Sequence, residues 1–491
     1  MAPNVDNIIN NRPLSTDPNE NAEMVKYAFT ESSDLIYYGI KTRFHAEVLL
    51  VYIEEIINTE VLNRDIIRPM VEGDDKAISV TAEGLRNHMP ITDVKKASDL
   101  SEVAKYLVLG KTIMFIKGLT ESLVLPTEKW EKRSLSEPES EVSSKGPRVG
   151  FIEDFKQNKA LLRKRIMNND LVFDDLVLGR QTKTLVSVGY VKGIVNTQIL
   201  CEVKRRLNEI DIDEVLDASY IQEMIKDAPL SPFNTVGYTE RPESVASKLL
   251  EGRICIICNG SPLVLTVPYL FLENFQTSED YNNHFFVASF VRLIRIMCFI
   301  LTVFTPGIYL ALVAFHQEMI PAPLLISFIA SRSGVPFPSY MEVIIMLFVF
   351  DLIRESGLRL PRALGQTVSI VGALVLGQAA VDAKFVSAPV VIIVAVTAIA
   401  SFVFFRINGA VIMYRMFILI LGAILGLYGV IFGAIILLLQ MMSIRSFGIM
   451  YMSYLGTFRQ QEYKDTIIRL PWWYMKVRPL KIARGNKVRE K

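Results

Sequence analysis

The sequence predicts a membrane protein in two parts: an α/β soluble N-terminal region with two similar subdomains, and a C-terminal α-helical transmembrane bundle. The first observation is a loss of charge near Met297, after which hydrophobic runs follow one another. The second is a sequence match between two segments of the charged half. Although hydrophobic residues make up 51% of the chain, charged residues still make up 21%, because the charge is concentrated in the first part.

The N-terminal segment, residues 1–25, is polar and lacks the apolar stretch of a secretory signal. We therefore expect it to be disordered and the large domain that follows to be cytoplasmic. The cysteine content agrees, because four cysteines give no disulfide framework and are typical of a reducing compartment. These are Cys201, Cys255, Cys258 and Cys298.

Two segments of the soluble half share the pattern Tyr-x-x-x-Ile-x-Asn-Thr, Tyr52–Leu62 and Tyr190–Leu200. Each follows a strand-like run and leads into a helical pattern, and the asparagine can cap that helix. We predict similar α/β subdomains over residues 26–131 and 149–288, joined by a linker of Ser, Glu and Pro at 132–148. Chance similarity between two strand-to-helix junctions is the alternative.

A hairpin should close the second subdomain. Asn259 and Gly260 separate two β-rich runs, which predicts pairing of Arg253–Cys258 with Leu263–Val267. The two cysteines of the first run are three positions apart and would face opposite sides of a strand. With no second ligand pair for a metal, we expect neither redox nor zinc chemistry there.

Catalytic motifs are absent from the sequence. It contains no P-loop, G-x-G-x-x-G, G-x-S-x-G or H-E-x-x-H motif. The histidines are scattered along the chain: His45, His88, His284 and His316. We predict that the protein is not an enzyme and has no catalytic residue, metal site or cofactor.

Uncharged runs supply the candidate membrane spans of a helical domain at residues 289–444, since a spanning helix needs about 20 apolar residues. The runs are Ile296–Gln317, Ala363–Val381, Phe385–Phe405 and Met416–Ile444, and the last two are expected to be packing spans. Prolines and Arg332 break the segment after the first run into a re-entrant element or an interfacial loop. The short run Val343–Phe350 favours an interfacial or bundle-packed helix.

The run beginning near Gly365 is the candidate pore-lining helix. On a helix that advances about 100° per residue, small residues share a face that would permit close helix packing. That face comprises Gly365, Gln366, Ser369, Gly372, Ala373 and Gly377. A second stripe, with an apolar constriction near Val371 that could gate by dewetting, comprises Thr367, Val368, Val371, Leu374 and Gln378. Ordinary small-residue packing is the alternative.

The tail, residues 445–491, is basic. A basic segment beside a span stays in the cytoplasm and attracts anionic lipid, and no recognition module favours a nucleic-acid partner. An even number of crossings would place both ends of the chain inside the cell. It would leave Arg354, Arg359 and Arg362 outside or buried.

Several stretches resemble a known family in its own order over about residues 30–475. They include GPRVGFIEDFKQNKALLRKRI, SEDY, PLLISFIASRSGVPFP, RESGLRLPRALGQTVSIVGALVLGQAAV and DTIIRLP. At these residues the chain resembles the A subunit of the GerA-type germinant receptors of endospore-forming bacteria. It departs from the family pattern at Asn282, Met450 and Tyr454.

The resemblance implies the A subunit of a nutrient-responsive receptor. Such a subunit is a multi-pass protein of the spore inner membrane that assembles with a transporter-like B subunit and a lipoprotein C subunit. It is expected to form a homo-oligomer, a pentamer, which acts as a nutrient-gated cation channel and starts germination. The alternatives are an A-like subunit of the spore ion-release system, or a membrane scaffold or transporter component without its own pore.

Overall fold

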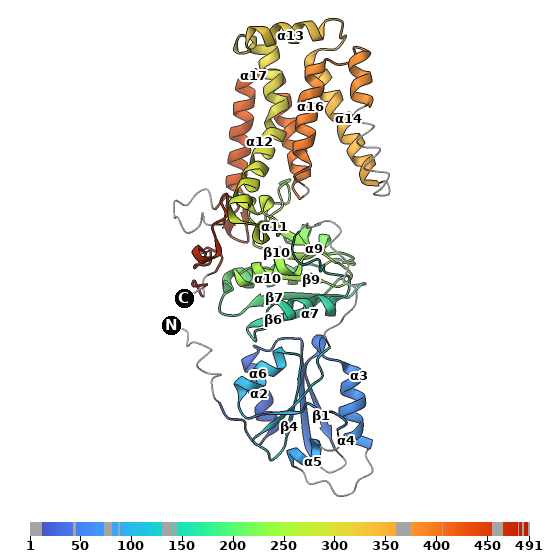
Figure 1. Cartoon of the computed structure of the whole chain (residues 1–491), viewed down its shortest axis with the longest axis vertical. Coiled ribbons are helices and arrows are strands. Elements are labelled where there is room, and N and C mark those ends of the chain that lie inside the picture. The colour runs from blue at the N-terminus through green and yellow to red at the C-terminus, as the bar shows by residue number, and fades with distance from the viewer. Residues whose placement is uncertain are drawn as a thin grey trace.

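The chain forms two α/β subdomains and a helical C-terminal region, stacked along the longest axis (Figure 1). The computed structural model describes residues 12–42, 46–72, 81–86, 89–129, 141, 145–359, 375–404, 406–453, 465–479, 481–483 and 486–489. The mixed α/β half and the helical half agree with the α/β and helical parts of the predicted fold class.

The first subdomain is a five-stranded antiparallel sheet in the order β1-β2-β4-β5-β3. Its elements are α2 (Pro18–Ala28), β1 (Leu35–Lys41), β2 (Glu47–Ile53), η1 (Glu54–Ile56), α3 (Thr59–Val61), η2 (Leu62–Ile67), α4 (Arg68–Glu72), α5 (Ala82–Arg86), β3 (Lys95–Ala97), α6 (Leu100–Val108), β4 (Thr112–Ile116) and β5 (Ser122–Leu125). Helices α2 and α6 bury Val25 and Leu107 on one face, and η2 and α4 bury Ile66 and Met70 on the other.

The expected disorder through residue 25 is wrong from Arg12 onward. Helix α2 begins at Pro18, and the side chain of Asp17 caps it by accepting the N–H of Asn19 at 3.0 Å. Leu14 is buried in the same core as Val25. The few apolar residues of this segment become ordered because the first sheet offers them a surface.

The second subdomain repeats the sheet order, as β6-β7-β9-β10-β8. Its elements are α7 (Phe155–Arg165), β6 (Leu171–Leu178), β7 (Thr184–Val191), α8 (Thr197–Asn208), α9 (Ala218–Ile225), β8 (Gly237–Thr239), α10 (Pro242–Leu250), β9 (Ile254–Cys258) and β10 (Val264–Val267). Helices α8 and α9 cover one face with Val203 and Ile221, and α7 and α10 cover the other with Leu162 and Val245.

The two Asn-Thr junctions occupy equivalent places, as predicted. Each follows the second strand of its sheet. Asn58 Oδ1 accepts the N–H of Glu60 at 3.0 Å and thereby caps α3. Asn196 Oδ1 accepts the N–H of Gln198 at 3.1 Å and caps α8. Equal strand order with equivalent caps supports a duplication, while the residue boundaries of the subdomains stay a prediction.

The predicted hairpin is confirmed. Strands β9 and β10 pair antiparallel, with Ile256 opposite Leu265, and Gly260 has a φ of +83° in the turn. Cys255 and Cys258 lie in different cores, on opposite faces of the sheet. Burial raises the pKa of each thiol to about 12, so both stay protonated at neutral pH.

Buried ion pairs join the two subdomains. Arg163 Nε donates to Asp34 Oδ2 at 2.7 Å, and both side chains are fully buried. Lys159 Nζ lies 3.1 Å from Glu55 Oε1, also out of water. Since all four charges are paired across the boundary, the two subdomains are held in one arrangement.

The helical region follows the second subdomain. Its elements are η3 (Phe271–Phe275), α11 (Glu279–Asn282), α12 (Phe285–Phe315), η4 (Gln317–Met319), α13 (Ala322–Arg332), α14 (Ser339–Arg359), a helical segment at 375–382, α16 (Ala388–Ser401), α17 (Asn408–Ser443), β11 (Arg445–Ser446), β12 (Ile449–Met450) and η5 (Trp472–Tyr474). By length and composition, α12 and α17 are the two described helices that could cross a membrane.

Helix α17 is two antiparallel legs, so the prediction of one span at Met416–Ile444 is wrong. Gly426 has φ +61° and ψ −142°, outside any helix. Tyr414 Oη contacts Gln440 Oε1 although the residues are 26 positions apart. A straight helix would separate them by roughly 39 Å. The legs, at 408–425 and 427–443, are each roughly 26 Å long.

The first leg of α17 crosses α12 closely. A Cβ added to Gly307 would lie 2.9 Å from Ile418, and one added to Gly422 would lie 2.7 Å from the carbonyl oxygen of Gly307. Small residues therefore let these two backbones approach, as they do where membrane helices pack.

The two irregular segments of the apolar half are both helical. Helix α13 lies across the far end of the bundle in Figure 1 and buries none of its residues, as an interfacial element would. Helix α14 packs into the bundle, where Val343 and Leu347 are fully buried. Its apolar run is short, but the neighbouring helices cover one side of it.

The C-terminal tail returns to the second subdomain (Figure 1). Arg478 Nε donates to the carbonyl oxygen of Leu250 at 2.7 Å, and Ala483 is buried in that subdomain's core. The chain therefore enters and leaves the helical bundle at the same end, the one that faces the second subdomain.

Arg354 also lies at this end, since its Nη1 donates to Asn408 Oδ1 at the start of α17 at 2.9 Å. We expected Arg354 to lie outside or buried. It does not lie at the far end of the bundle, because α14 runs back toward the aqueous subdomains, and the Arg354 side chain is 15% exposed there.

Candidate functional site

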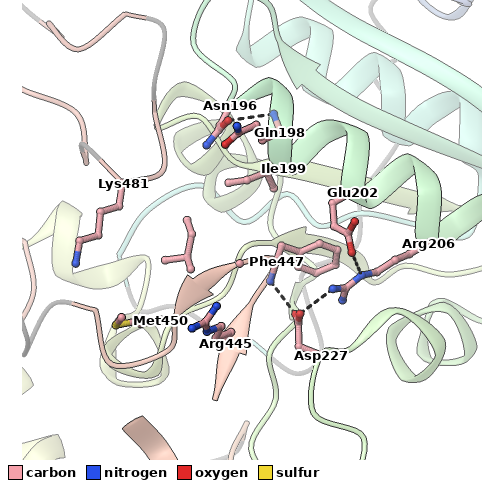
Figure 2. A pocket seen from close by; sticks show the side chains of 12 residues that line it. Asn196, Gln198, Ile199, Glu202, Arg206, Asp227, Arg445, Phe447, Met450 and Lys481 are labelled. Atoms are coloured by element: carbon pink, nitrogen blue, oxygen red, sulfur yellow. Dashed lines mark hydrogen bonds and ion pairs between the residues drawn. The ribbon is translucent and has the colours of Figure 1, made fainter. Parts of the chain in front are cut away.

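A short hairpin attaches the last apolar helix to the second subdomain. Between β11 and β12, Phe447 turns at φ +48° and its N–H donates to Asp227 Oδ2 at 2.7 Å. Arg206 donates to the other oxygen of Asp227 at 2.8 Å and lies over the Phe447 ring at 4.5 Å (Figure 2). The Phe447 side chain is buried in the subdomain's core. The end of α17 is thus fixed to the sheet domain.

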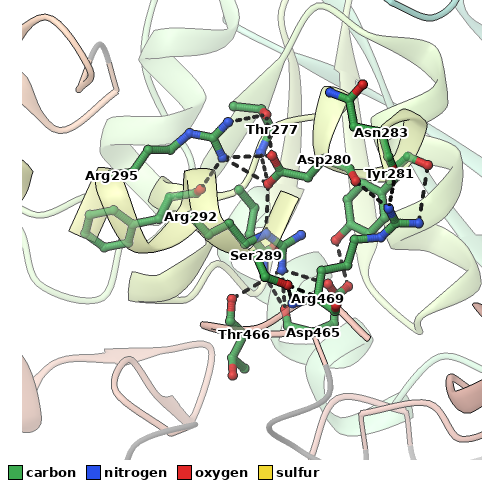
Figure 3. A network of polar contacts seen from close by, with 12 residues as sticks. Thr277, Asp280, Tyr281, Asn283, Ser289, Arg292, Arg295, Asp465, Thr466 and Arg469 are labelled. Atoms are coloured by element: carbon green, nitrogen blue, oxygen red, sulfur yellow. Dashed lines mark hydrogen bonds and ion pairs between the residues drawn. The ribbon is translucent and has the colours of Figure 1, made fainter. Parts of the chain in front are cut away.

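A polar network attaches the first apolar helix at the same level (Figure 3). Arg292 of α12 is fully buried, and its Nε donates to Asp280 Oδ2 of α11 at 2.8 Å. Its Nη1 donates to Asp465 Oδ1, in the C-terminal segment, at 2.8 Å. One guanidinium therefore joins three separate stretches of chain.

Two more arginines complete the network. Arg295 donates to Asp280 Oδ1 at 2.9 Å, and Arg469 donates to the carbonyl oxygen of Asp280 at 2.7 Å. Tyr281 Oη donates to Asp465 Oδ2 at 2.7 Å, and burial together with the Asp465 charge raises the pKa of this phenol well above its usual value. Three arginines around the buried Asp280 and the partly exposed Asp465 make a rigid junction between the subdomains and the bundle.

A third connection uses the loop between α16 and α17. Arg406 forms an ion pair with Glu141 of the linker and lies 5.9 Å above the Tyr238 ring. Arg241 Nε donates to the Glu141 carbonyl oxygen at 2.8 Å. The linker between the subdomains therefore contacts the base of the bundle directly.

Most predicted pore and packing residues lie outside the described residues. These are Thr367, Val368, Val371 and Leu374 of the pore stripe, and Gly365, Gln366, Ser369, Gly372 and Ala373 of the packing face. Gln378 is exposed and Gly377 is buried on the segment 375–382. A Cβ on Gly377 would lie 3.6 Å from Val391 of α16, which is ordinary contact distance.

The bundle holds buried charges that the sequence reading missed. Arg415 is fully buried and donates to Asp351 Oδ2 of α14 at 2.5 Å. Glu342 is also fully buried and accepts the N–H and the hydroxyl of Ser387 at 2.8 and 2.7 Å. The partner of each charge lies far away in sequence. None of these charges was predicted as a site from the sequence.

The junction was also missed as a site, although the sequence carried a signal for it. Asp280 belongs to the stretch SEDY, and Asp465 and Arg469 to DTIIRLP, two of the stretches that carry the family resemblance. Nothing in their spacing indicates that they meet.

Among the residues that the structure describes, no three His, Cys, Asp or Glu side chains gather to hold a metal. Chemically, this arrangement can transmit a displacement between the two halves.

Comparisons with known proteins agree across nearly the whole chain. The family model of the Bacillus/Clostridium GerA spore germination protein matches residues 23–481. Spore germination protein KA of Bacillus subtilis (strain 168) is 39% identical over 488 residues, covering 98% of this chain and 89% of that protein. The uncharacterized membrane protein YfkQ of the same organism is 38% identical over 477 residues, covering 97% of this chain and 93% of that protein.

A solved structure is similar as well. It is the crystal structure of the N-terminal domain of the A subunit of the Bacillus megaterium spore germinant receptor GerK3, which is 28% identical to this chain. The match covers 53% of this chain and 98% of that one, with a TM-score of 0.40.

Proposed function

Because the chain belongs to the Bacillus/Clostridium GerA spore germination protein family, we propose that it is the A subunit of a nutrient-responsive germinant receptor. In this role it oligomerises into a cation channel of the spore inner membrane, which opens in response to nutrient and starts germination. It works with a transporter-like B subunit and a lipoprotein C subunit. It carries out no catalysis of its own.

One observation carries this proposal: the aqueous half is attached both to the first helix of the bundle, α12, and to the end of its last helix, α17. Arg292 joins α12 to Asp280 and Asp465, and Phe447 joins the exit of α17 to the second subdomain. A mere membrane anchor would need neither connection. Two buried attachments instead suit a protein in which a change in one half must move the other.

The orientation follows from the positive charges. Arg292, Arg295, Arg354 and Arg406 all lie at the end of the bundle that faces the subdomains. Arginines beside membrane spans favour the cytoplasmic side. We therefore place the N-terminal half and the C-terminal tail in the cytoplasm, with α13 at the opposite membrane surface.

The channel itself requires several copies of the chain, for which the pentamer of the family is our proposal. In the described part of the bundle, Arg415 pairs with Asp351, and Glu342 accepts hydrogen bonds from Ser387. Gln378, from the predicted pore stripe, is exposed on the outside of the bundle instead. That position would let the stripe face a central pore shared by neighbouring subunits, with Val371 at the constriction.

The pore assignment is tested by Val371→Ala in spores. A smaller side chain widens an apolar constriction and weakens dewetting, so these spores should release cations and germinate without nutrient. Val396→Ala, on an exposed position of α16, is the matched control and should leave dormancy intact. If Val371→Ala spores stay as tightly dormant as the control, the pore lies elsewhere.

A further inference from the structure

A group of exposed aromatic side chains lies where the start of α12 meets the C-terminal segment. Phe286 and Phe290 of α12, and Trp473 and Tyr474 of η5, are each more than half exposed. The ring of Phe285 joins the two groups, since its centre lies 4.2 Å from that of Phe286 and 6.2 Å from that of Trp473. We call these five side chains the aromatic surface. None of the functions proposed above uses it.

The aromatic surface is continuous with the apolar face of α12. Phe286, Phe290, Leu293 and Met297 are spaced four, three and four positions apart, so they share one side of the helix. All four are exposed, and Ile300 extends the same face toward the middle of the helix. Helix α12 is one of the two described helices that could cross a membrane. Whatever covers this face of the crossing helix therefore also reaches the aromatic surface.

The length of α12 gives the depth of the aromatic surface. The helix has 31 residues and is roughly 46 Å long. A bilayer is about 40–45 Å thick when its headgroup layers are included. A single crossing by α12 therefore places Phe285 in one headgroup layer and Phe315 in the other. This step rests on the membrane location proposed above.

We propose that the aromatic surface is a membrane anchor, which inserts into the headgroup layer on the side of the aqueous subdomains. Tryptophan and tyrosine concentrate at this depth of a bilayer, because the ring is apolar while its N–H or hydroxyl group can reach water. A contiguous apolar patch on a protein surface marks contact with a membrane or another protein. Continuity with the crossing face of α12 favours the lipid surface as the partner.

Trp472 connects the aromatic surface to the polar network of Figure 3. The centre of its ring lies 5.5 Å from the guanidinium carbon of Arg469 and 5.9 Å from the ring centre of Tyr281. Arg469 in turn donates to the carbonyl oxygen of Asp280 at 2.7 Å. The lipid surface therefore helps to hold the junction in place, through the C-terminal segment.

The test measures the depth of Trp473 by fluorescence. The chain has three tryptophans, so Trp130→Phe with Trp472→Phe leaves Trp473 as the single emitter. The full chain is reconstituted in liposomes of phosphatidylcholine that carries bromine either near the headgroup or near the bilayer centre, since bromine quenches tryptophan at short range. Trp473 should lose more emission to bromine near the headgroup than to bromine at the centre.

The matched control is Tyr27→Trp in a chain whose three native tryptophans are replaced by phenylalanine. Tyr27 is exposed on α2 of the first subdomain, far along the chain from the bundle. Its replacement should lose emission to iodide in the water and to neither brominated lipid. Trp473 should lose less emission to iodide than this control does. An unchanged thermal midpoint verifies that both chains are folded.

Three results would overturn the anchor. Quenching of Trp473 by iodide alone, as strong as in the control, would leave the aromatic surface in water. Quenching by neither iodide nor lipid would show that protein, a second copy of the chain or another subunit, covers it. Strongest quenching by bromine at the centre would place it in the hydrocarbon core.

Flotation of the liposomes on a density gradient separates this inference from the proposed function. A chain that floats with the liposomes while bromine leaves Trp473 unquenched contradicts the anchor and leaves the membrane location intact. A chain that does not float contradicts the membrane location, and the anchor with it.

Discussion

At the scale of single residues, the junction depends on the buried carboxylate of Asp280. Asp280 is 2% exposed and accepts hydrogen bonds from Arg292 and Arg295. Removing one partner from a buried ion pair costs about 3–5 kcal/mol, because the charge left behind stays out of water without its partner. The junction should therefore be sensitive to changes that keep side-chain shape but remove charge.

Asp280→Asn should lower the thermal stability of the full chain and uncouple nutrient addition from cation release. The matched control is Asp211→Asn, which removes a carboxylate from a solvent-exposed pair with Arg180 and should leave thermal stability nearly unchanged. Thermal unfolding and spore cation release measure the two effects. If the two variants show the same thermal stability and the same cation release on nutrient addition, Asp280 does not couple the two halves.

The two buried cysteines should be chemically inert. Burial raises the pKa of Cys255 and Cys258 to about 12, and a protonated thiol is a poor nucleophile. At about pH 8, iodoacetamide should modify exposed Cys201 in the native protein, and should modify Cys255 and Cys258 only in denaturant. Mass spectrometry reads the sites. Rapid native labelling of Cys255 or Cys258 would restore the redox interpretation that we rejected.

At the scale of elements, the crossing of α12 and α17 rests on glycines. The backbones approach so closely at Gly307 and Gly422 that neither position has room for a Cβ. A larger side chain must push the helices apart, and overpacking of this kind costs about 1–3 kcal/mol or more.

Gly422→Leu should therefore destabilise the bundle and reduce the amount of assembled receptor. Gly409→Leu is the control, since a Cβ at Gly409 of the same helix would meet nothing within 4 Å. Size-exclusion chromatography and thermal unfolding in detergent compare the two variants. A Gly422→Leu receptor that assembles and unfolds like Gly409→Leu would show that this crossing tolerates separation.

The sequence predicted elements whose signals are local. The Tyr-x-x-x-Ile-x-Asn-Thr repeat located both capped helices, and Asn259-Gly260 located the hairpin, because a cap or turn is encoded by adjacent residues. The reversal at Gly426 could not be read in the same way. Gly422, Gly429 and Gly433 stand nearby in the same apolar run, and no polar residue marks which glycine turns. In the structure, Gly426 turns at φ +61°, and a Cβ added there would lie 3.0 Å from both Phe315 and His316 at the end of α12.

The candidate site was predicted least well, for a related reason. Asp280 and Asp465 are far apart in sequence, yet both pair with Arg292. In the bundle, Asp351 and Arg415 are likewise far apart in sequence and pair with each other. No periodicity or spacing indicates such a pairing. The pore stripe around Val371 stays a prediction, because the structure describes only its last member, Gln378.

At the scale of the whole molecule, the aqueous half and the bundle behave as one connected body. Buried pairs such as Arg163 with Asp34 hold the two subdomains together, and Arg292 and Phe447 hold the second subdomain to the helices. A displacement of the subdomains would thus reach both the first and the last helix of the bundle. That is the structural basis on which we propose a gated channel.

The most direct test is ion conductance of the purified chain, reconstituted in liposomes with its B and C subunits and exposed to candidate nutrients. We predict cation flux that begins on nutrient addition, is lost in Asp280→Asn and is present without nutrient in Val371→Ala. The channel proposal would be contradicted if the liposomes bind nutrient but stay impermeable to cations with the unaltered chain, with Asp280→Asn and with Val371→Ala.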